Sequence, residues 1–326
     1  MPSQPAPPVT GWRKAVLIAL RIVIVTGLLV IGLGAVVRLM PGSVPFALAL
    51  SGRSRMCSPQ EVWQVGAVRK QLHEETLELR KSSKIVETDA DGNELWETPV
   101  GRFWLPHGSE EAAAVLIAQQ EVDQYGAIHG DVKPGDIVLD AGAHVGLYAR
   151  KALEKGAKTV VAIEPAPANL ECLRRNLAQE IADGKVIVYP KGVWDKEEDL
   201  PLFEDPNNSA ADTFIHNSET MVAHHTIPLT RIDTLVQELG LERVDVIKMD
   251  IKGATQKALA GGAETIRKDR PHIVLSTEED NDDPYAIAEQ IASIDPSYHT
   301  GCGGCFIGAG GAIEPDIIHL MPGDSK

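Results

Sequence analysis

One stretch of the sequence combines residue types that could hold a nucleotide-like ligand. Residues 137–146 read IVLDAGAHVG, so Asp140 ends an apolar run and Gly142 and Gly146 follow it. An apolar run of this length is typical of a buried strand, and glycines after it let the backbone approach a ligand at the start of the next helix. The Gly-x-Gly-x-x-Gly pattern of dinucleotide-binding folds is not met, because His144 stands where the middle glycine is required.

A second acid follows at the end of the next apolar segment. The stretch VVAIEP contains Glu164, which lies 22 residues after Gly142 (164 − 142). A carboxylate at that spacing can accept hydrogen bonds from both hydroxyls of a ribose. Asp140 at the first strand end suits a ligand that carries a positive charge. The two acids and the glycine loop together favour S-adenosylmethionine, and the alternative is a structural turn with a surface glutamate.

These residues need a sheet that brings the strand ends together. From residue 131 onward, short apolar segments alternate with helical ones. Strands are predicted over 136–140, 159–164, 185–191, 244–250 and 272–277, and helices over 147–155, 167–182, 255–268 and 284–294. This alternation predicts an α/β fold with a doubly wound, mostly parallel sheet, and the glycine-rich segment 297–320 predicts a final antiparallel pair.

The segment before this sheet carries its own signals. Ser58, Pro59 and Glu61 form a helix start with a capping box, and the helix is predicted to run to about residue 82. Residues 84–105 predict a strand pair with its turn at 91–93, and residues 110–128 predict a helix. We interpret the first helix as a spacer or a packing arm.

The N-terminal part contains an apolar run over residues 15–37 whose only charge is Arg21. A helix of that length covers roughly 34 Å, so we expect a transmembrane helix between a disordered tail over 1–14 and a juxtamembrane linker and helix over 38–94. The alternative is a signal peptide cleaved near Ala49. Basic residues after the run favour a single-pass protein of the cell membrane with a cytoplasmic catalytic part.

Charge excludes some classes of partner. The chain has 31 Lys and Arg against 46 Asp and Glu, a formal net charge of −15. An acidic balance of this size argues against non-specific binding to nucleic acid or to anionic lipid. Hydrophobic residues make up 44% of the 326 residues, which is enough for a packed core.

Several blocks of the sequence resemble one known family. In order, these are GDIVLDAGAHVG, VVAIEPAPANLECLRRNL, IPLTRIDTL, VDVIKMDIKGA and RPHIVLSTE. They are similar to the FkbM family of S-adenosylmethionine-dependent methyltransferases, and the resemblance covers roughly residues 95–280. It implies a Rossmann-like class I methyltransferase domain over 95–326, S-adenosylmethionine as cofactor, and methyl transfer to a hydroxyl of a small molecule, a sugar or a lipid-linked acceptor.

The resemblance also implies which residues hold the cofactor and which serve the acceptor. The cofactor-binding residues would be Glu121, Asp140, Gly142, Ala143, His144, Gly146, Glu164, Gly192, Val193 and Asp250. A hydroxyl acceptor must lose its proton, and Asp250 at the end of the fourth strand is the first candidate for the base. His224 and His225 are the second, unless they are ordinary surface histidines of a lid-like loop. Lys252 could orient an anionic acceptor or could be a solvated residue at a helix start.

The sequence departs from the family where the acceptor would bind. Lys252 and Thr255 stand where the family usually has acids, and Ser276 stands near its usual glutamate. His144 replaces the usual asparagine of the glycine loop and would cap the helix, contact the cofactor carboxylate or act as a base. The alternative function is therefore a membrane-anchored binding module that has lost methyl transfer.

Four cysteines are too few for a disulfide scaffold. The spacing of His299, Cys302 and Cys305 could hold zinc with a fourth ligand, or form a redox pair or a local disulfide. Because one Cys-x-x-Cys pair stands alone in a glycine-rich turn, we expect a plain flexible hairpin and no metal. Cys172 is expected to be a buried small apolar residue.

Overall fold

The computed structural model describes residues 10–40, 42–204, 209–215, 221–277 and 282–323. Its central sheet has seven strands in the order β12-β13-β11-β10-β4-β5-β6. Their bounds are β4 (Ile137–Ala141), β5 (Thr159–Ile163), β6 (Val186–Tyr189), β10 (Val246–Met249), β11 (His272–Ser276), β12 (Tyr298–Ile307) and β13 (Ile313–Pro322). The pairs from β11 through β10, β4 and β5 to β6 are parallel, and β13 joins β11 and β12 antiparallel. The prediction of a mostly parallel sheet with a final antiparallel pair is confirmed.

Helices cover both faces of this sheet, because successive strand residues point to opposite sides. Leu139, Ile247 and Met249 pack in one apolar cluster with α8 (Ile232–Glu238), α9 (Thr255–Gly261), α10 (Ala263–Asp269) and α11 (Pro284–Ile294). Val138 and Val246 pack in another cluster with α5 (Leu147–Glu154) and α6 (Pro167–Asn176). The short α7 (Ala178–Ala182) follows α6. Two buried faces explain why the parallel strands are continuously apolar.

The strand order reverses at the centre of the sheet. β4 is followed in sequence by its neighbour β5, whereas its other neighbour is β10, more than a hundred residues later. Ligands of open α/β sheets bind at such a point, beyond the carboxyl ends of the strands. The glycine loop, Glu164 and Asp250 therefore come to the same edge of the sheet.

The segment before the sheet follows the sequence signals closely. α3 (Pro59–Ser82) begins with the capping box, since Ser58 Oγ accepts from the Glu61 N–H at 3.3 Å and Glu61 Oε2 accepts from the Ser58 N–H at 2.6 Å. β1 (Lys84–Thr88), β2 (Glu94–Thr98) and β3 (Gly101–Leu105) form an antiparallel meander, one strand more than predicted. α4 (Glu110–Glu121) then packs beside α3 and leads to β4.

A small third sheet was not predicted. β7 (Gly192–Val193), β8 (Glu198–Glu204) and β9 (Val222–Thr230) associate in the order β7-β9-β8, and short 3-10 turns lie at Ser209–Ala211 and Ala309–Gly311. β9 occupies the segment that the sequence suggested as a lid-like loop. Its first residues are exposed and only its last ones are buried, so the alternating pattern that marks a strand is weak.

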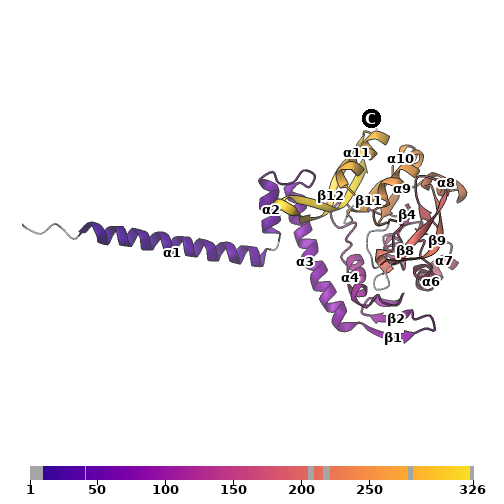
Figure 1. Cartoon of the computed structure of the whole chain (residues 1–326), viewed down its shortest axis with the longest axis horizontal. Helices are drawn as coiled ribbons and strands as arrows, with labels where there is room; N and C mark the ends of the chain where they lie inside the picture. The colour runs from indigo at the N-terminus through magenta and orange to yellow at the C-terminus, as the bar shows by residue number, and fades with distance from the viewer. Residues whose placement is uncertain (1–9, 41, 205–208, 216–220, 278–281, 324–326) are drawn as a thin grey trace, which may run out of the picture.

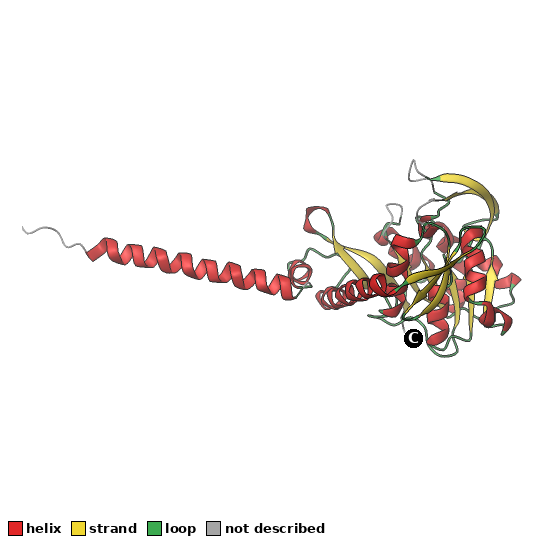
Figure 2. Ribbon diagram, turned by 90° about the horizontal axis from the view of Figure 1, so that it is seen from below, coloured by secondary structure: helices red, strands yellow, loops and turns green. Residues whose placement is uncertain are grey.

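The N-terminal α1 (Thr10–Leu39) extends away from the sheet and its helices, and α2 (Ser43–Leu50) follows it (Figures 1 and 2). The predicted transmembrane helix is wrong: among the described residues, no helix is both long and apolar enough to cross a bilayer. The prediction of a single-pass cell-membrane protein with a cytoplasmic catalytic part is corrected accordingly. Of the predicted disordered tail, residues 1–9 lie outside the described residues.

The glycine-rich end of the chain is more than a flexible hairpin. A disulfide joins Cys302 of β12 to Cys57, just before α3, across 245 residues of sequence. His299 does not belong to the cysteine cluster found among the described residues, which contains Cys57, Cys302 and Cys305. Cys172 is a buried free cysteine of α6, as predicted.

Candidate active site

A pocket opens at the carboxyl ends of β4, β5 and β10. Its wall includes the loop after β4, Glu164 after β5, and Lys248 and Asp250 at the end of β10. The segment around β7 to β9 completes it with Gly192, Val193, Leu202, Ser209, Ala210, Asp212, Thr213 and Phe214. The pocket therefore combines charged groups at the sheet edge with an outer wall that contains both apolar side chains and the polar Ser209, Asp212 and Thr213.

The backbone of the glycine loop has a left-handed conformation at three positions. Gly142 has φ +74°, Gly146 has φ +87° and His144 has φ +51°. Glycine adopts this region without strain, and Asn and His tolerate it better than most other residues. This explains both glycines and gives a backbone reason for His144 at a position where the family usually has Asn. An ideal Cβ on Gly142 would lie 2.1 Å from the Asp250 carbonyl oxygen, so this loop passes directly against the end of β10.

Glu164 ties the glycine loop to β5. Its Oε2 accepts from the His144 N–H at 2.7 Å, and its Oε1 accepts from the Ala166 N–H at 2.9 Å and from Asn169 Nδ2 at 3.3 Å. The residue is 4% exposed and lines the pocket. Burial raises the pKa of Glu164 to about 7, although these three donors lower it. A carboxyl group in a cleft whose pKa is shifted close to 7 is typical of a functional site.

Asp140 does not line the pocket. It is 0% exposed, and the parallel register of β10 and β4 places it opposite Lys248, whose Nζ lies 3.0 Å from Asp140 Oδ1. Lys248 also donates to the Gly142 carbonyl at 2.9 Å and is 4% exposed. Burial raises the pKa of Asp140, and the Lys248 ammonium opposes that effect. The predicted cofactor contact of Asp140 is therefore corrected to a buried ion pair that supports the glycine loop.

Asp250 presents its carboxylate to the pocket. Tyr125 Oη donates to Asp250 Oδ2 at 3.1 Å, and Lys252 Nζ lies 2.9 Å from Asp250 Oδ1. Burial by itself would raise the pKa of Asp250, but the charges of Lys252 and Lys248 outweigh it and lower the pKa to about 2. The group is thus ionised at neutral pH and is a weak base.

His144 turns its side chain toward the unpredicted wall of the pocket. Its Nε2 lies 2.8 Å from Ser209 Oγ. Burial, reinforced by the charge of Lys248, lowers the pKa of His144 to about 4. The imidazole is therefore neutral at pH 7, so it can accept a hydrogen bond but is a weak base.

Some predicted site residues lie elsewhere. Glu121 is exposed at the end of α4, and of the described residues that line the pocket, α4 contributes Leu116, Gln119 and Gln120 instead. His224 and His225 are exposed on β9, where His225 Nδ1 lies 2.9 Å from Glu204 Oε2. The structure therefore does not support Glu121 as a cofactor contact or the two histidines as bases, because none of them reaches the pocket.

The sequence of the segment that forms this pocket matches a known protein family. Residues 140–297 match the family model described as the methyltransferase FkbM domain. The chain carries an FkbM methyltransferase domain. It is 32% identical over 157 residues to the 2-O-methyltransferase NoeI of Sinorhizobium fredii, an alignment that covers 42% of this chain and 62% of that protein. It is 25% identical over 222 residues to the 31-O-demethyl-FK506 methyltransferase FkbM of Streptomyces tacrolimicus, covering 58% and 84% of the two chains.

A solved FkbM methyltransferase from Methylobacillus flagellatus aligns with 80% of this chain and 61% of its own, with a TM-score of 0.43 and 16% identity. The alignment with NoeI spans less than two thirds of that protein. The structure also places the three acceptor-side positions that depart from the family sequence pattern. Lys252 pairs with Asp250, Thr255 is buried at the start of α9, and Ser276 is buried at the end of β11.

Lys248 is the main site residue that the sequence did not reveal. Its signal was a lone lysine inside the apolar strand VIKMD, where a charged residue needs a buried partner. Asn169 and Ser209 were also missed, because they reach the pocket from a helix and from a turn that carry no motif.

Proposed function

We propose that this FkbM domain is an S-adenosylmethionine-dependent methyltransferase that methylates a hydroxyl of a small molecule, such as a sugar. The observation that carries the proposal is the buried carboxylate of Glu164 facing a pocket at the point where the strand order reverses. There Glu164 lies beside the left-handed glycine loop, which is where a carboxylate that binds a ribose is found in Rossmann-like folds.

The residues present fit this cofactor. Glu164 would accept from the ribose hydroxyls, and the apolar side chains of Val193, Leu202 and Phe214 suit a flat base. The ionised Asp250 supplies negative charge for a sulfonium. When bound, S-adenosylmethionine supplies an electrophilic methyl group on that sulfonium. The proposed cofactor residues thus include Glu164 and Asp250 but no longer Asp140.

The protein's own part in the reaction follows from the state of these groups. A displacement at a methyl group needs alignment above all, which supplies up to about 7–11 kcal/mol in favourable cases. Asp250 would accept a hydrogen bond from the acceptor hydroxyl and hold it in line. With a pKa of about 2, Asp250 is poorly matched to remove the proton outright. The neutral imidazole of His144 is the second acceptor that lines the pocket.

Oxygen as the acceptor atom is supported by the relatives. The name of the Sinorhizobium protein specifies a 2-O-methyltransferase, and that of the Streptomyces protein specifies a 31-O-demethyl-FK506 methyltransferase. Lys252 beside Asp250 would favour an acceptor with an anionic group, provided that the ion pair opens. The proposal also specifies that the acceptor is of small-molecule size and is not a nucleic acid.

The test follows the transfer of a labelled methyl group from S-adenosylmethionine to a panel of hydroxylated small molecules. Asp250→Asn should lower the transfer rate at least about 10²-fold, the lower end of what a positioned proton acceptor contributes. Its affinity for S-adenosylhomocysteine, which lacks the sulfonium charge, should stay within tenfold of the wild type.

The second candidate function is a module that binds the cofactor but does not transfer. The observation that favours it is the Lys252 ammonium on the Asp250 carboxylate, which occupies the group expected to serve the acceptor. This reading predicts cofactor binding with no labelled product from any acceptor. Lys252→Glu, which restores the acid usual in the family, would then be needed to gain transfer.

A further inference from the structure

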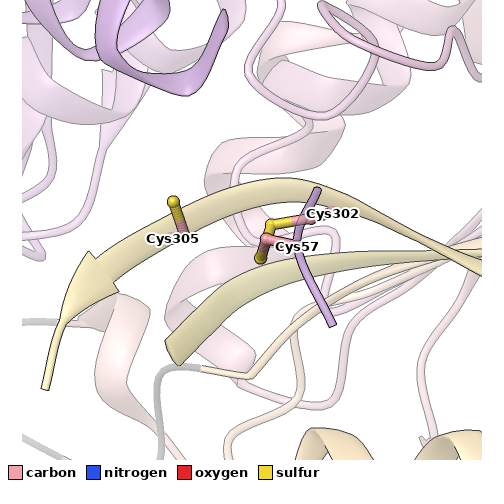
Figure 3. Close-up of side chains that lie close together, drawn as sticks. All are labelled: Cys57, Cys302 and Cys305. Carbon is pink, nitrogen blue, oxygen red and sulfur yellow. A yellow bond between two sulfur atoms is a disulfide. The ribbon is translucent and has the colours of Figure 1, made fainter. Parts of the chain in front are cut away.

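Three cysteine sulfurs from two distant parts of the chain meet beneath α3. The sulfur atoms of Cys57, Cys302 and Cys305 all lie within 4.8 Å of one another, and all three residues are buried (Figure 3). Cys57 and Cys302 form the disulfide, while Cys305 is a free thiol beside it. Four equivalent sulfurs around a tetrahedral zinc ion, at a Zn–S distance of about 2.3 Å, would be separated by about 3.8 Å. Because no sulfur lies more than 4.8 Å from another, the cluster can reach that size once the bond between Cys57 and Cys302 is broken.

The backbone is shaped to bring Cys302 and Cys305 together. In a regular strand, residues three apart point to opposite faces. Here the register between β12 and β13 shifts between Cys302 and Gly304 and again between Gly304 and Cys305. An ideal Cβ on Gly304 would lie 2.2 Å from Asp316 Oδ1, so a larger residue at position 304 would have to displace the Asp316 side chain. The irregular backbone therefore places both sulfurs on the same cluster.

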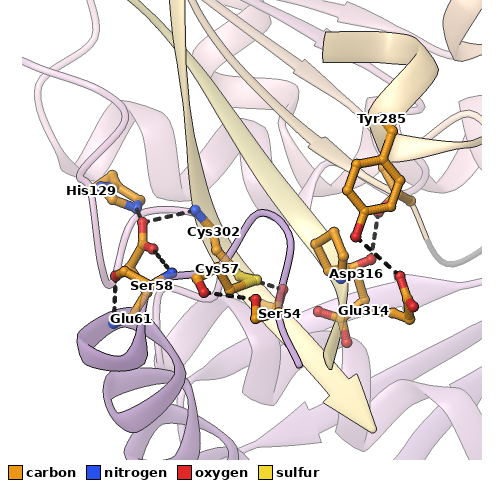
Figure 4. Close-up of a disulfide and its surroundings, with 12 residues drawn as sticks. Ser54, Cys57, Ser58, Glu61, His129, Tyr285, Cys302, Glu314 and Asp316 are labelled. Carbon is orange, nitrogen blue, oxygen red and sulfur yellow. Dashed lines mark hydrogen bonds and ion pairs between the residues drawn. A yellow bond between two sulfur atoms is a disulfide. The ribbon is translucent and has the colours of Figure 1, made fainter. Parts of the chain in front are cut away.

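The third cysteine is held by the start of α3 (Figure 4). Ser54 Oγ donates to the Cys57 carbonyl at 2.7 Å, and the Cys302 N–H donates to Glu61 Oε1 at 3.0 Å. The same Glu61 oxygen lies 2.9 Å from His129 Nε2, while Oε2 accepts from the Ser58 N–H. Both oxygens of Glu61 are thus engaged in positioning, so we assign the metal-binding atoms to sulfur alone.

We infer that, once the disulfide is reduced, Cys57, Cys302 and Cys305 form a site for one zinc ion. A thiol or phosphine reductant supplies two electrons, and two protons complete the Cys57 and Cys302 thiols as the S–S bond breaks. Binding of zinc by three thiolates then releases three protons. The fourth ligand is a water or small ligand from the pocket beside Cys305, formed by Pro45, Val62, Val65, Gly66, Arg69, Lys70 and His73.

Charged residues of both signs lie beside that complex. Three thiolates around one zinc ion carry a net charge of −1, and the pocket next to Cys305 is lined by Lys70 and by Arg69, which pairs with Asp316.

The test uses the full chain, reduced with a phosphine under anaerobic conditions and titrated with Co²⁺ as a spectroscopic probe for zinc. We expect one Co²⁺ per chain with a thiolate-to-cobalt charge-transfer band, which zinc displaces. Cys305→Ser keeps the disulfide partners and should bind at least tenfold more weakly, because loss of a ligand costs more than loss of an outer contact. Cys172→Ser, at a lone buried cysteine, is the matched control and should behave like the wild type.

Two further measurements do not depend on a variant's folding. Unreduced wild type should show no charge-transfer band, since the disulfide removes two ligands. In reduced wild type, zinc should protect Cys57, Cys302 and Cys305 from alkylation as read by mass spectrometry. The inference is overturned if the reduced chain gives no thiolate band, if Cys305→Ser binds as tightly as wild type, or if zinc leaves alkylation unchanged.

Discussion

The buried ion pair between Lys248 and Asp140 allows a quantitative prediction about stability. Replacing Lys248 with Met keeps most of the side-chain volume but leaves the Asp140 carboxylate, 0% exposed, without its cation at 3.0 Å. Breaking a buried pair from one side costs about 3–5 kcal/mol, because the remaining charge is not compensated. We expect Lys248→Met to lower the free energy of unfolding by that amount.

The chain offers a matched control for this variant. Lys257 Nζ lies 2.7 Å from Asp195 Oδ2, but its side chain is 53% exposed. An exposed pair of this kind contributes at most about 1 kcal/mol. Lys257→Met should therefore change stability far less than Lys248→Met. The double variant Asp140→Asn/Lys248→Met removes both charges and should recover at least half of the loss.

The assay is urea unfolding followed by tryptophan fluorescence at pH 5 and at pH 8. Burial already raises the pKa of Asp140 in the folded chain, and loss of Lys248 raises it further. A raised pKa favours the protonated folded state, so stability falls as the pH rises. The free energy of unfolding that Lys248→Met loses relative to the wild type should be larger at pH 8 than at pH 5. A loss no larger than that caused by Lys257→Met would refute the reasoning.

Three further predictions concern the pocket and its support. The pKa of Glu164 is about 7 in the folded chain against an ordinary 4.5, so the free energy of unfolding falls as the pH rises from about 4.5 through 7. Glu164→Gln removes the titrating group and should reduce that fall by up to about 3 kcal/mol, as measured by denaturant unfolding at several pH values. Gly142→Ala should lower the melting temperature more than Gly130→Ala, since both have positive φ but only Gly142 abuts the Asp250 backbone. Ser58→Ala, which removes the α3 cap, should cost about 0.5–2 kcal/mol by thermal unfolding.

Local patterns predicted the elements that carry the site. The apolar strands, the capping box at Ser58 and the left-handed glycine loop are each specified within a few neighbouring residues, and the structure has them all. Glu164 was found because it ends a strand adjacent to β4. Its position at the sheet edge follows from the alternation of strands and helices alone.

Features that depend on distant pairing were missed. The partnership of Lys248 with Asp140 depends on the register between β10 and β4, which sequence spacing does not specify. The Cys57–Cys302 disulfide spans 245 residues, and β8 pairs with β9 across a long connection. The apolar run over residues 15–37 predicted a membrane-spanning helix, whereas among the described residues no helix is long and apolar enough to cross a membrane.

The proposed methyl transfer requires the pocket beside Glu164 to bind S-adenosylmethionine. Binding is measured by calorimetric titration of the full chain with S-adenosylmethionine and S-adenosylhomocysteine, with Glu164→Ala as the comparison. We predict one binding site per chain for each ligand in the wild type and at least tenfold weaker binding in Glu164→Ala, since a charged hydrogen-bonding group contributes roughly 1.5–3 kcal/mol. No binding by the wild type, or equal affinity in Glu164→Ala, would contradict the account.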